Sequence, residues 1–311
     1  MKTVYAPGRS RNFRSAIVVL LFFFLCAPAA FAEAGLTKIA DNVYSSVDIR
    51  NAAPQNSFGA NAGIVIGRDG IVVIDTLISA KEAKRFIRQI RAVSDKPIKY
   101  VVNTHHHLDH TFGNSEFAKL GAVIIDQENI GKIIARYDEA AFRSAVKRIG
   151  LTDEDMQGTE QWLPALTFND RLTIDLGDQK IELISQGHSH TEDSIVAYLP
   201  DKKILFAGDL LFTNYHTNLM DADLGGWVRA LDKIMAINAS VIVPGHGPLS
   251  GNKDLQAMKD YLVGFDKKAR ELAAGGKNAE TIASEIIKAF PERKELSGMV
   301  SVNVQAKYVK N

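Results

Sequence analysis

The stretch that decides how this chain folds is Thr104-His105-His106-His107-Leu108-Asp109-His110. Five of its side chains can bind a metal ion, and it follows directly on Ile98–Asn103, an apolar run predicted to be a strand. Because residues i and i+2 at the end of a strand point the same way, His105 and His107 are expected to reach one ion. Asp109 and His110 are expected to begin a helix and face a second position. Imidazole and carboxylate ligands of this kind suit zinc.

Three more segments with histidine or aspartate follow predicted strands elsewhere in the chain. They are Gly187–Thr191 after Lys180–Ser185, Gly208-Asp209 after Ile204–Ala207, and Pro244–Pro248 after Val241–Val243. The carboxyl ends of strands in an α/β sheet converge at one edge, so loops that are distant in sequence meet there. The four placements together therefore predict one composite metal site at a sheet edge.

The rest of the chain alternates short strands with amphipathic helices, which indicates a layered α/β domain with sheets inside and helices outside. Further strands are predicted at Val43–Ile49, Ala62–Ile66, Ile71–Asp75, Ala122–Ile125, Arg171–Leu176 and Ser194–Leu199. Helices are predicted at Ser79–Val93, Asp109–Leu120, Gln127–Arg136, Ala140–Arg148, Gly226–Ala236, Leu255–Ala273 and Thr281–Phe290. No linker rich in Pro, Gly or Ser interrupts this order. We expect one catalytic domain over residues 33–275, followed at 276–311 by a helix and a polar tail.

The first 32 residues have the pattern of a secretory signal peptide. A basic region at residues 1–14 precedes Ala16–Cys26, an unbroken apolar run of 11 residues. That run is too short to span a bilayer core of about 30 Å as a helix. Ala30-Phe31-Ala32 then supplies a cleavage site of the A-x-A type. We expect an exported, periplasmic protein with no stable membrane anchor after cleavage.

Intact-mass measurement tests the predicted cleavage. The exported protein should begin near Glu33, because cleavage follows Ala32. Soluble protein that retains Met1 would contradict the prediction.

Charge and cysteine content exclude several classes of protein. Without residues 1–32 the chain has 33 basic and 36 acidic residues, a formal charge of −3. A nucleic-acid-binding protein needs a basic face, so we expect no nucleic-acid partner and a small-molecule substrate instead. The only cysteine, Cys26, lies in the signal segment, which removes disulfides, thiolate nucleophiles and cysteine zinc sites from the mature chain.

The string T-H-x-H-x-D-H, followed by G-x-x-H-T, a strand ending in G-D, and P-G-H-G, resembles the metallo-β-lactamase superfamily over roughly Val43 to Leu262. The resemblance implies a four-layer αββα sandwich with the active site at one edge. It also implies two zinc ions per chain, with iron or manganese as alternative metals. The implied first-zinc ligands are His105, His107 and His190; the implied second-zinc ligands are Asp109, His110 and His246, with Asp209 bridging both.

Some roles depend on the details of these motifs. His190 is favoured over His188 because Thr191 follows it directly, as in the family motif. Asp75 matches a carboxylate that supports the histidine loop. His106 is expected to be structural or to lie outside the ligand set, and His216 to lie at the surface or at the rim of the pocket.

The resemblance implies a hydrolase in which a metal-bridging hydroxide attacks an amide, lactam, ester or thioester, with Asp109 orienting the nucleophile. A β-lactamase proper is one alternative, since Asn218-Leu219 and Asp221-Ala222-Asp223 echo subclass B1. However, Asp209 replaces that subclass's zinc-binding cysteine, and Phe212 replaces its substrate-binding lysine. A nuclease or phosphodiesterase of the same fold is a second candidate, and a metal-binding protein without catalysis is a third. The pocket walls are expected from residues 48–59 and 215–227.

Overall fold

The computed structural model describes residues 35–47, 51–130, 133 and 139–309. The predicted signal segment and half of the helix expected at Gln127–Arg136 lie outside these ranges. No helix among the described residues is both long enough and apolar enough to cross a membrane.

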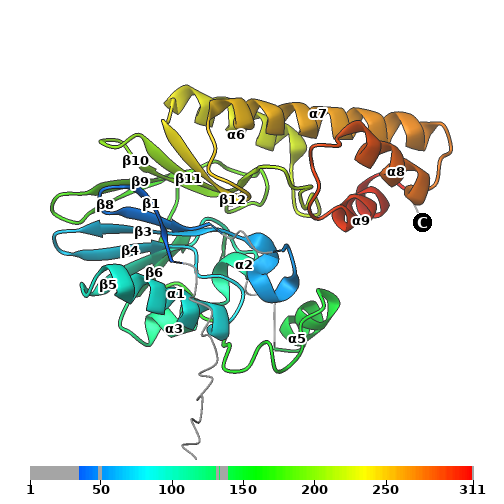
Figure 1. Cartoon of the computed structure of the whole chain (residues 1–311). Coiled ribbons are helices and arrows are strands. Elements are labelled where there is room, and N and C mark those ends of the chain that lie inside the picture. The colour runs from blue at the N-terminus through cyan, green and yellow to red at the C-terminus, as the bar shows by residue number, and fades with distance from the viewer. Residues whose placement is uncertain (1–34, 48–50, 131–132, 134–138, 310–311) are drawn as a thin grey trace, which may run out of the picture. The chain divides into compact units, whose positions relative to one another are not determined.

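The first sheet has seven strands in the order β1-β2-β3-β4-β5-β6-β7. Strands β1 to β4 pair antiparallel, and β4 to β7 pair parallel. The strands are β1 Thr37–Ala40, β2 Val43–Ser46, β3 Ala62–Gly67, β4 Gly70–Ile74, β5 Ile98–Val102, β6 Val123–Gln127 and β7 Leu166–Phe168; the 3₁₀ segment η1 Pro54–Gly59 lies between β2 and β3. Helices α1 Ala80–Val93 and α3 Asn114–Ala118 cover its outer face (Figure 1).

The second sheet has five strands in the order β12-β11-β10-β9-β8. They are β8 Arg171–Asp175, β9 Lys180–Ser185, β10 Ile195–Leu199, β11 Ile204–Phe212 and β12 Val241–His246. Within this described sheet, β12 alone pairs parallel, with β11. Helices α6 Leu224–Ile237 and α7 Asn252–Ala274 cover the outer face of the sheet (Figure 1).

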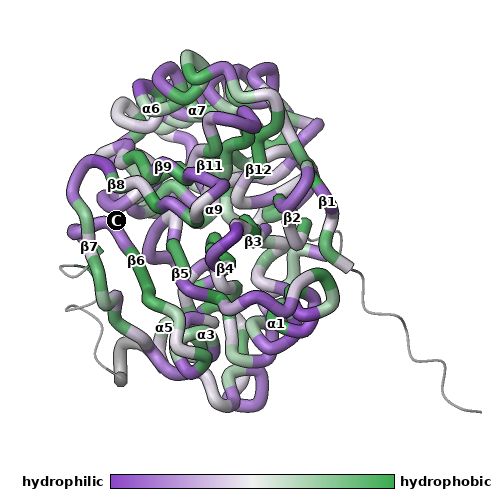
Figure 2. The backbone as a smooth tube through the Cα atoms, turned by 90° about the vertical axis from the view of Figure 1, so that its left-hand side faces the viewer, coloured by the Kyte–Doolittle hydropathy of each residue, from purple (hydrophilic) through white to green (hydrophobic). Residues whose placement is uncertain are grey.

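Three buried apolar layers hold these parts together. Side chains from both sheets, such as Val72 and Ile74 on β4 and Leu183 on β9, form the layer between the sheets. Phe86 and Ile90 of α1 pack beneath the first sheet, and Trp227 of α6 packs on the second. Apolar segments accordingly gather in the strands, for example β6 and β11 (Figure 2). This arrangement is the layered α/β fold that the order of elements predicted, and the αββα sandwich that the family resemblance implied.

The helix predicted over Asp109–Leu120 is two short helices, α2 Leu108–Thr111 and α3, separated at Phe112-Gly113. At the break, the backbone N–H of Gly113 donates to the carbonyl oxygen of Leu77, in the loop after β4, at 3.0 Å instead of to a carbonyl of α2. A Cβ at Gly113 would lie 2.0 Å from the carbonyl oxygen of Thr76, so only glycine fits there. The break turns α2 toward the sheet edge where the histidines gather.

The expectation of a polar tail after the last predicted helix is wrong. After α8 Ala279–Ala289, a further helix α9 Gly298–Lys307 packs against the molecule. Its sequence begins with glycine and carries three valines, which disfavour helix. Burial of Val300, Asn303 and Val304 outweighs that local preference. The sequence also failed to predict the short strands β1 and β7. Helix α5 Glu139–Arg148 completes the described elements.

Candidate metal centre

All seven predicted metal ligands lie at one edge, past or near the carboxyl ends of β5, β9, β11 and β12. Strand β5 ends at Val102, so His105 and His107 belong to the following loop. The loop, and not strand alternation, therefore brings their imidazoles together, which corrects the reason given from sequence. Asp209 lies inside β11, which continues to Phe212 where the sequence predicted an end at Ala207.

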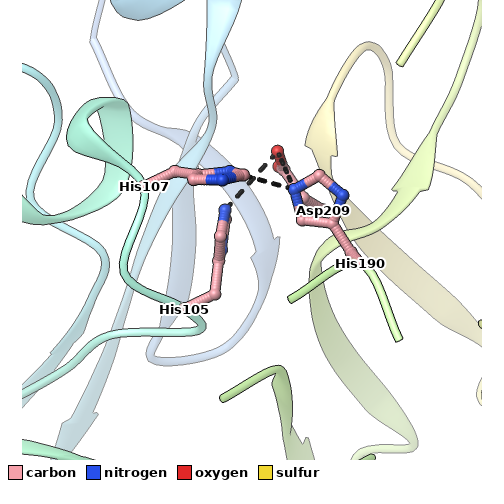
Figure 3. Close-up of side chains that lie close together, drawn as sticks. All are labelled: His105, His107, His190 and Asp209. Atoms are coloured by element: carbon pink, nitrogen blue, oxygen red, sulfur yellow. Dashed lines mark hydrogen bonds and ion pairs between the residues drawn. The ribbon is translucent and has the colours of Figure 1, made fainter. Parts of the chain in front are cut away.

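The first group contains His105, His107, His190 and Asp209, whose ligand atoms all lie within 4.8 Å of one another (Figure 3). His190 Nε2 lies 3.0 Å from His107 Nδ1 and 3.4 Å from Asp209 Oδ2. His105 Nε2 lies 3.6 Å from the same carboxylate oxygen. Three imidazole nitrogens and one oxygen thus face a common point, as a tetrahedral zinc site requires.

The second group contains Asp109, His110 and His246, again with ligand atoms within 4.8 Å. His246 Nε2 lies 3.3 Å from Asp109 Oδ2, and His110 Nε2 lies 3.6 Å from the same oxygen. Asp109 and His110 reach this position because α2 begins at Leu108, directly after the histidine loop. The grouping matches the division between two ions that the family resemblance implied.

Asp209 lies between the two groups. Its Oδ2 faces His105 and His190, while its Oδ1 is 3.1 Å from His110 Nε2 and 3.4 Å from His246 Nε2. A carboxylate with one oxygen toward each group can bridge two ions. Gly245 permits this position, since a Cβ there would lie 1.9 Å from Asp209 Oδ1.

The buried polar atoms at the centre test whether a metal fits. Among the described residues, His105 Nε2, His110 Nε2 and Asp209 Oδ1 are buried without a hydrogen-bond partner. Such atoms are costly to bury unless something satisfies them, and all three point to the same centre. Five imidazoles and two carboxylates are a donor set that two zinc ions, or other divalent ions of similar preference, would satisfy.

Asp75 fixes the histidine loop that follows β5 through contacts with Thr104 and His110. It is buried, accepts hydrogen bonds from the backbone N–H (2.8 Å) and hydroxyl (2.9 Å) of Thr104, and lies 2.9 Å from His110 Nδ1. Its backbone has a φ of 61°, a strained conformation for a residue other than glycine. The contact with Asp75 fixes Nδ1 of His110, and this orientation of the ring directs Nε2 toward the metal position.

Similar contacts fix other ligands. His107 Nε2 lies 3.0 Å from Asp221 Oδ2, and His246 Nδ1 lies 3.1 Å from the carbonyl oxygen of Phe58. The ring of Phe212 stacks on that of His246 at 4.8 Å with 5° between the planes. The family motif could have pointed to Asp221, but no sequence signal identifies a backbone carbonyl such as that of Phe58.

Three histidines lie outside the two groups. His106 Nδ1 lies 2.8 Å from Asp193 Oδ1, and His106 also forms, with His107 and Asp221, a third and more exposed set of potential ligands within 4.8 Å of one another. Exposed His188 lies 2.8 Å from the carbonyl oxygen of Asp221 and joins neither group. The expectation for His216 is wrong, because it is fully buried with Nδ1 3.0 Å from the hydroxyl of Tyr261. The sequence could not predict this burial, because His216 lies in an irregular segment and is covered by α7, which is distant in the chain.

The electrostatics of the centre favour neutral His190 and protonated His246 before metal binds. Burial lowers the pKa of His190 to about 4. Burial also opposes charge on His246, but the carboxylates of Asp209 and Asp109 outweigh it and raise its pKa to about 9. In metal-free protein this raised pKa stabilises the fold fully below pH 6.5, and the contribution is lost as pH rises toward 9.

Metal binding should therefore release a proton. An imidazole must be neutral to bind metal, so affinity at the His246 position should rise as the pH rises to about 9. Calorimetric titration of the metal-free protein with zinc at about pH 7.5, in two buffers with different ionisation enthalpies, measures the release. Equal heats in both buffers would contradict the prediction.

A pocket of about 460 Å³ opens onto the centre. Phe58, Asn218, Met220 and Asp221 line it, in agreement with the two wall segments expected from sequence. The remaining walls come from regions that the sequence did not implicate. They include Ile130, Ile133, Ala145, Arg148, Ile149, Gln161, Trp162, Leu296, Met299 and Val302.

Comparison with known proteins agrees with this geometry. Residues 56–246 match the metallo-beta-lactamase superfamily. A linear primary-alkylsulfatase of Pseudomonas sp. is 30% identical over 225 residues, which cover 60% of this chain but 42% of the alkylsulfatase. A metallo-beta-lactamase type 2 of Bacteroides fragilis is 25% identical over 235 residues, covering 74% of this chain and 86% of that protein. A solved metallo-beta-lactamase from Pontibacter korlensis is 26% identical with a TM-score of 0.56, covering 73% of this chain and 98% of that one.

The fold and the two groups of ligands define a class of metal-dependent hydrolases. The chain belongs to the metallo-beta-lactamase superfamily.

Proposed function

We propose that this protein is an exported binuclear zinc hydrolase that cleaves an amide, lactam, ester or thioester bond in a small molecule. The observation that carries the proposal is the position of Asp209, with one carboxylate oxygen facing each group of histidines. Export is supported by the signal pattern in residues 1–32.

Bound zinc lowers the pKa of coordinated water to about 7 and so supplies hydroxide at neutral pH. The protein's own residues position the reaction. His105, His107 and His190 would hold one ion, and Asp109, His110 and His246 the other. Asp109 is the more accessible of the two central carboxylates, with 14% of its side chain exposed against 4% for Asp209. It can therefore orient the nucleophile and accept its proton as well as bind metal.

Phe212 and Trp227 shape the environment of these ligands. Their rings lie 5.8 Å and 4.8 Å from the His190 ring, and both are buried. Apolar cover of this kind excludes water from one side of the centre and strengthens its electrostatic interactions. The same Phe212 leaves no lysine at the position where subclass B1 holds the substrate carboxylate. This departure favours a hydrolase of the wider superfamily over a β-lactamase.

A second candidate activity is hydrolysis of a sulfate ester. The identity of 30% with a linear primary-alkylsulfatase favours it. It would use the same metal centre, so one assay series can separate the candidates.

The experiment combines metal analysis with a substrate panel. The mature protein should contain two equivalents of metal and hydrolyse at least one of a chromogenic cephalosporin, a thioester, a p-nitrophenyl ester and an alkyl sulfate. Chelation should abolish the activity and zinc should restore it. Two bound metal ions without turnover of any of these substrates would contradict the proposal. Turnover confined to a phosphodiester would favour a nuclease or phosphodiesterase instead.

A further inference from the structure

Helix α9 and the turn before it lie outside the part that matches the superfamily, which ends at His246, yet they build one wall of the pocket. Leu296, Met299 and Val302, from α9 and the turn before it, line the pocket beside Met220. The metal-binding motifs of residues 104–246 could not predict this wall, because it contains no metal ligand.

Buried polar contacts hold this wall in place. Arg293 donates from Nη1 to the carbonyl oxygens of Phe212 and Tyr215, at 3.1 Å and 2.6 Å. Asn303, fully buried on α9, donates to the carbonyl oxygen of Thr217 at 2.7 Å and accepts from the backbone N–H of Leu219 at 2.8 Å. Arg293 therefore fixes the segment before α9 to the backbone of Phe212, whose ring stacks on His246, and Asn303 fixes α9 itself to residues 217–219.

The surface that this wall faces is also apolar. Leu108 and Phe112 flank the metal ligands of α2, and Phe58, Ile149 and Trp162 line the pocket as well. Three of the large apolar side chains that remain exposed, Trp162 at 41%, Met220 at 48% and Val302 at 43%, line this pocket. Exposed apolar groups gathered at one pocket mark a binding surface.

Charge in the pocket is confined to few residues. The metal end carries Asp109, Asp209 and Asp221, and Arg148 is the only lysine or arginine among the described lining residues. Metal ions held at this end would act as Lewis acids toward a carbonyl or an anionic group of the substrate. The rest of the lining offers mainly apolar contact.

We infer that the substrate is an amphiphile, with a linear apolar chain packed against Met299, Val302 and Trp162 and its hydrolysable group at the metal centre. The inference rests on the proposed hydrolytic function for the position of the reacting group. Its apolar part rests on the pocket walls alone. Val302 is therefore a specificity-determining residue.

Binding of straight-chain carboxylates tests the inference without requiring hydrolysis. Hexanoate, octanoate and decanoate are titrated into the zinc-loaded mature protein, with calorimetry and tryptophan fluorescence as readouts. Affinity should rise by about two- to four-fold per added CH₂ until the pocket is filled, because each buried CH₂ favours binding. Equal affinity for the three acids would overturn the inference.

Two variants on one helix locate the effect. Val302→Glu places a charge in the pocket wall and should reduce decanoate affinity by about 10-fold or more, because a carboxylate cannot replace the apolar contact. Acetate binding and the two equivalents of metal should stay unchanged. Ser301→Glu is the matched control, since Ser301 is exposed and lies outside this pocket. It should bind decanoate as the wild type does. If Val302→Glu keeps the chain-length dependence, the wall assignment is wrong.

The outcomes separate this inference from the proposed function. Chain-length-dependent binding without turnover of any substrate in the panel would support the pocket assignment and contradict the hydrolase proposal. Turnover of p-nitrophenyl esters with a KM independent of chain length, together with equal affinities for the three acids, would support the hydrolase proposal and contradict the pocket assignment.

Discussion

Asp209→Asn is expected to lower metal affinity by about 10-fold or more, and turnover of any substrate by a larger factor. The Asp209 carboxylate faces both groups of ligands, with Oδ1 3.1 Å from His110 Nε2 and Oδ2 3.4 Å from His190 Nε2. An amide offers one neutral oxygen in place of two that share a negative charge. Two cations held side by side would then repel each other with less compensation. Competition with a chromophoric chelator measures the affinity.

Asp201→Asn is the matched control for this variant. Asp201 is exposed at the turn that precedes β11, the strand that carries Asp209, so the substitution is the same but far from the centre. It should keep full metal content and activity. Full metal content and activity in Asp209→Asn itself would show that Asp209 is structural, and the bridged mechanism would fail.

The sequence predicted the layered fold because the spacing of apolar residues depends on the local helix or strand, and most segments keep that local structure in the folded protein. Strand β9 has the predicted bounds, and α1 begins one residue after the predicted start, where Ser79 caps it by accepting a hydrogen bond from the N–H of Glu82. Errors arose where tertiary contacts decide. One predicted helix is divided where the N–H of Gly113 bonds to Leu77 in another segment, and burial makes α9 helical despite its valines.

That the candidate ligands would gather at one sheet edge was also predictable, because each lies within, at or after the carboxyl-terminal part of a strand and these strand ends meet. What surrounds them was not. The positive φ of Asp75, the Phe58 carbonyl that orients His246 and the burial of His216 under Tyr261 depend on segments far apart in the chain. The apolar wall from α9 belongs to the same category. A motif therefore identified the candidate chemistry, whereas the pocket that selects a substrate required the structure.

His246→Ala is expected to reduce the metal content from two equivalents to one. His246 Nε2 contributes to the second group only, at 3.3 Å from Asp109 Oδ2 and 3.4 Å from Asp209 Oδ1. The four residues of the first group, including His105 and His190, remain intact. Loss of contacts that merely orient ligands costs about 10- to 100-fold in affinity, so loss of a ligand itself should cost about 100-fold or more at that position. Elemental analysis after dialysis at neutral pH gives the stoichiometry.

His188→Ala is the control, because it removes an imidazole at the same sheet edge that belongs to neither group. His188 is exposed and its Nε2 lies 2.8 Å from a backbone carbonyl oxygen, that of Asp221. This variant should retain both ions, since that contact is with the loop and not with the centre. If it loses an ion, His188 and not His190 completes the first group. If His246→Ala still holds two equivalents, the division of ligands between two positions is wrong, because the remaining Asp109, His110 and Asp209 would then suffice for the second ion.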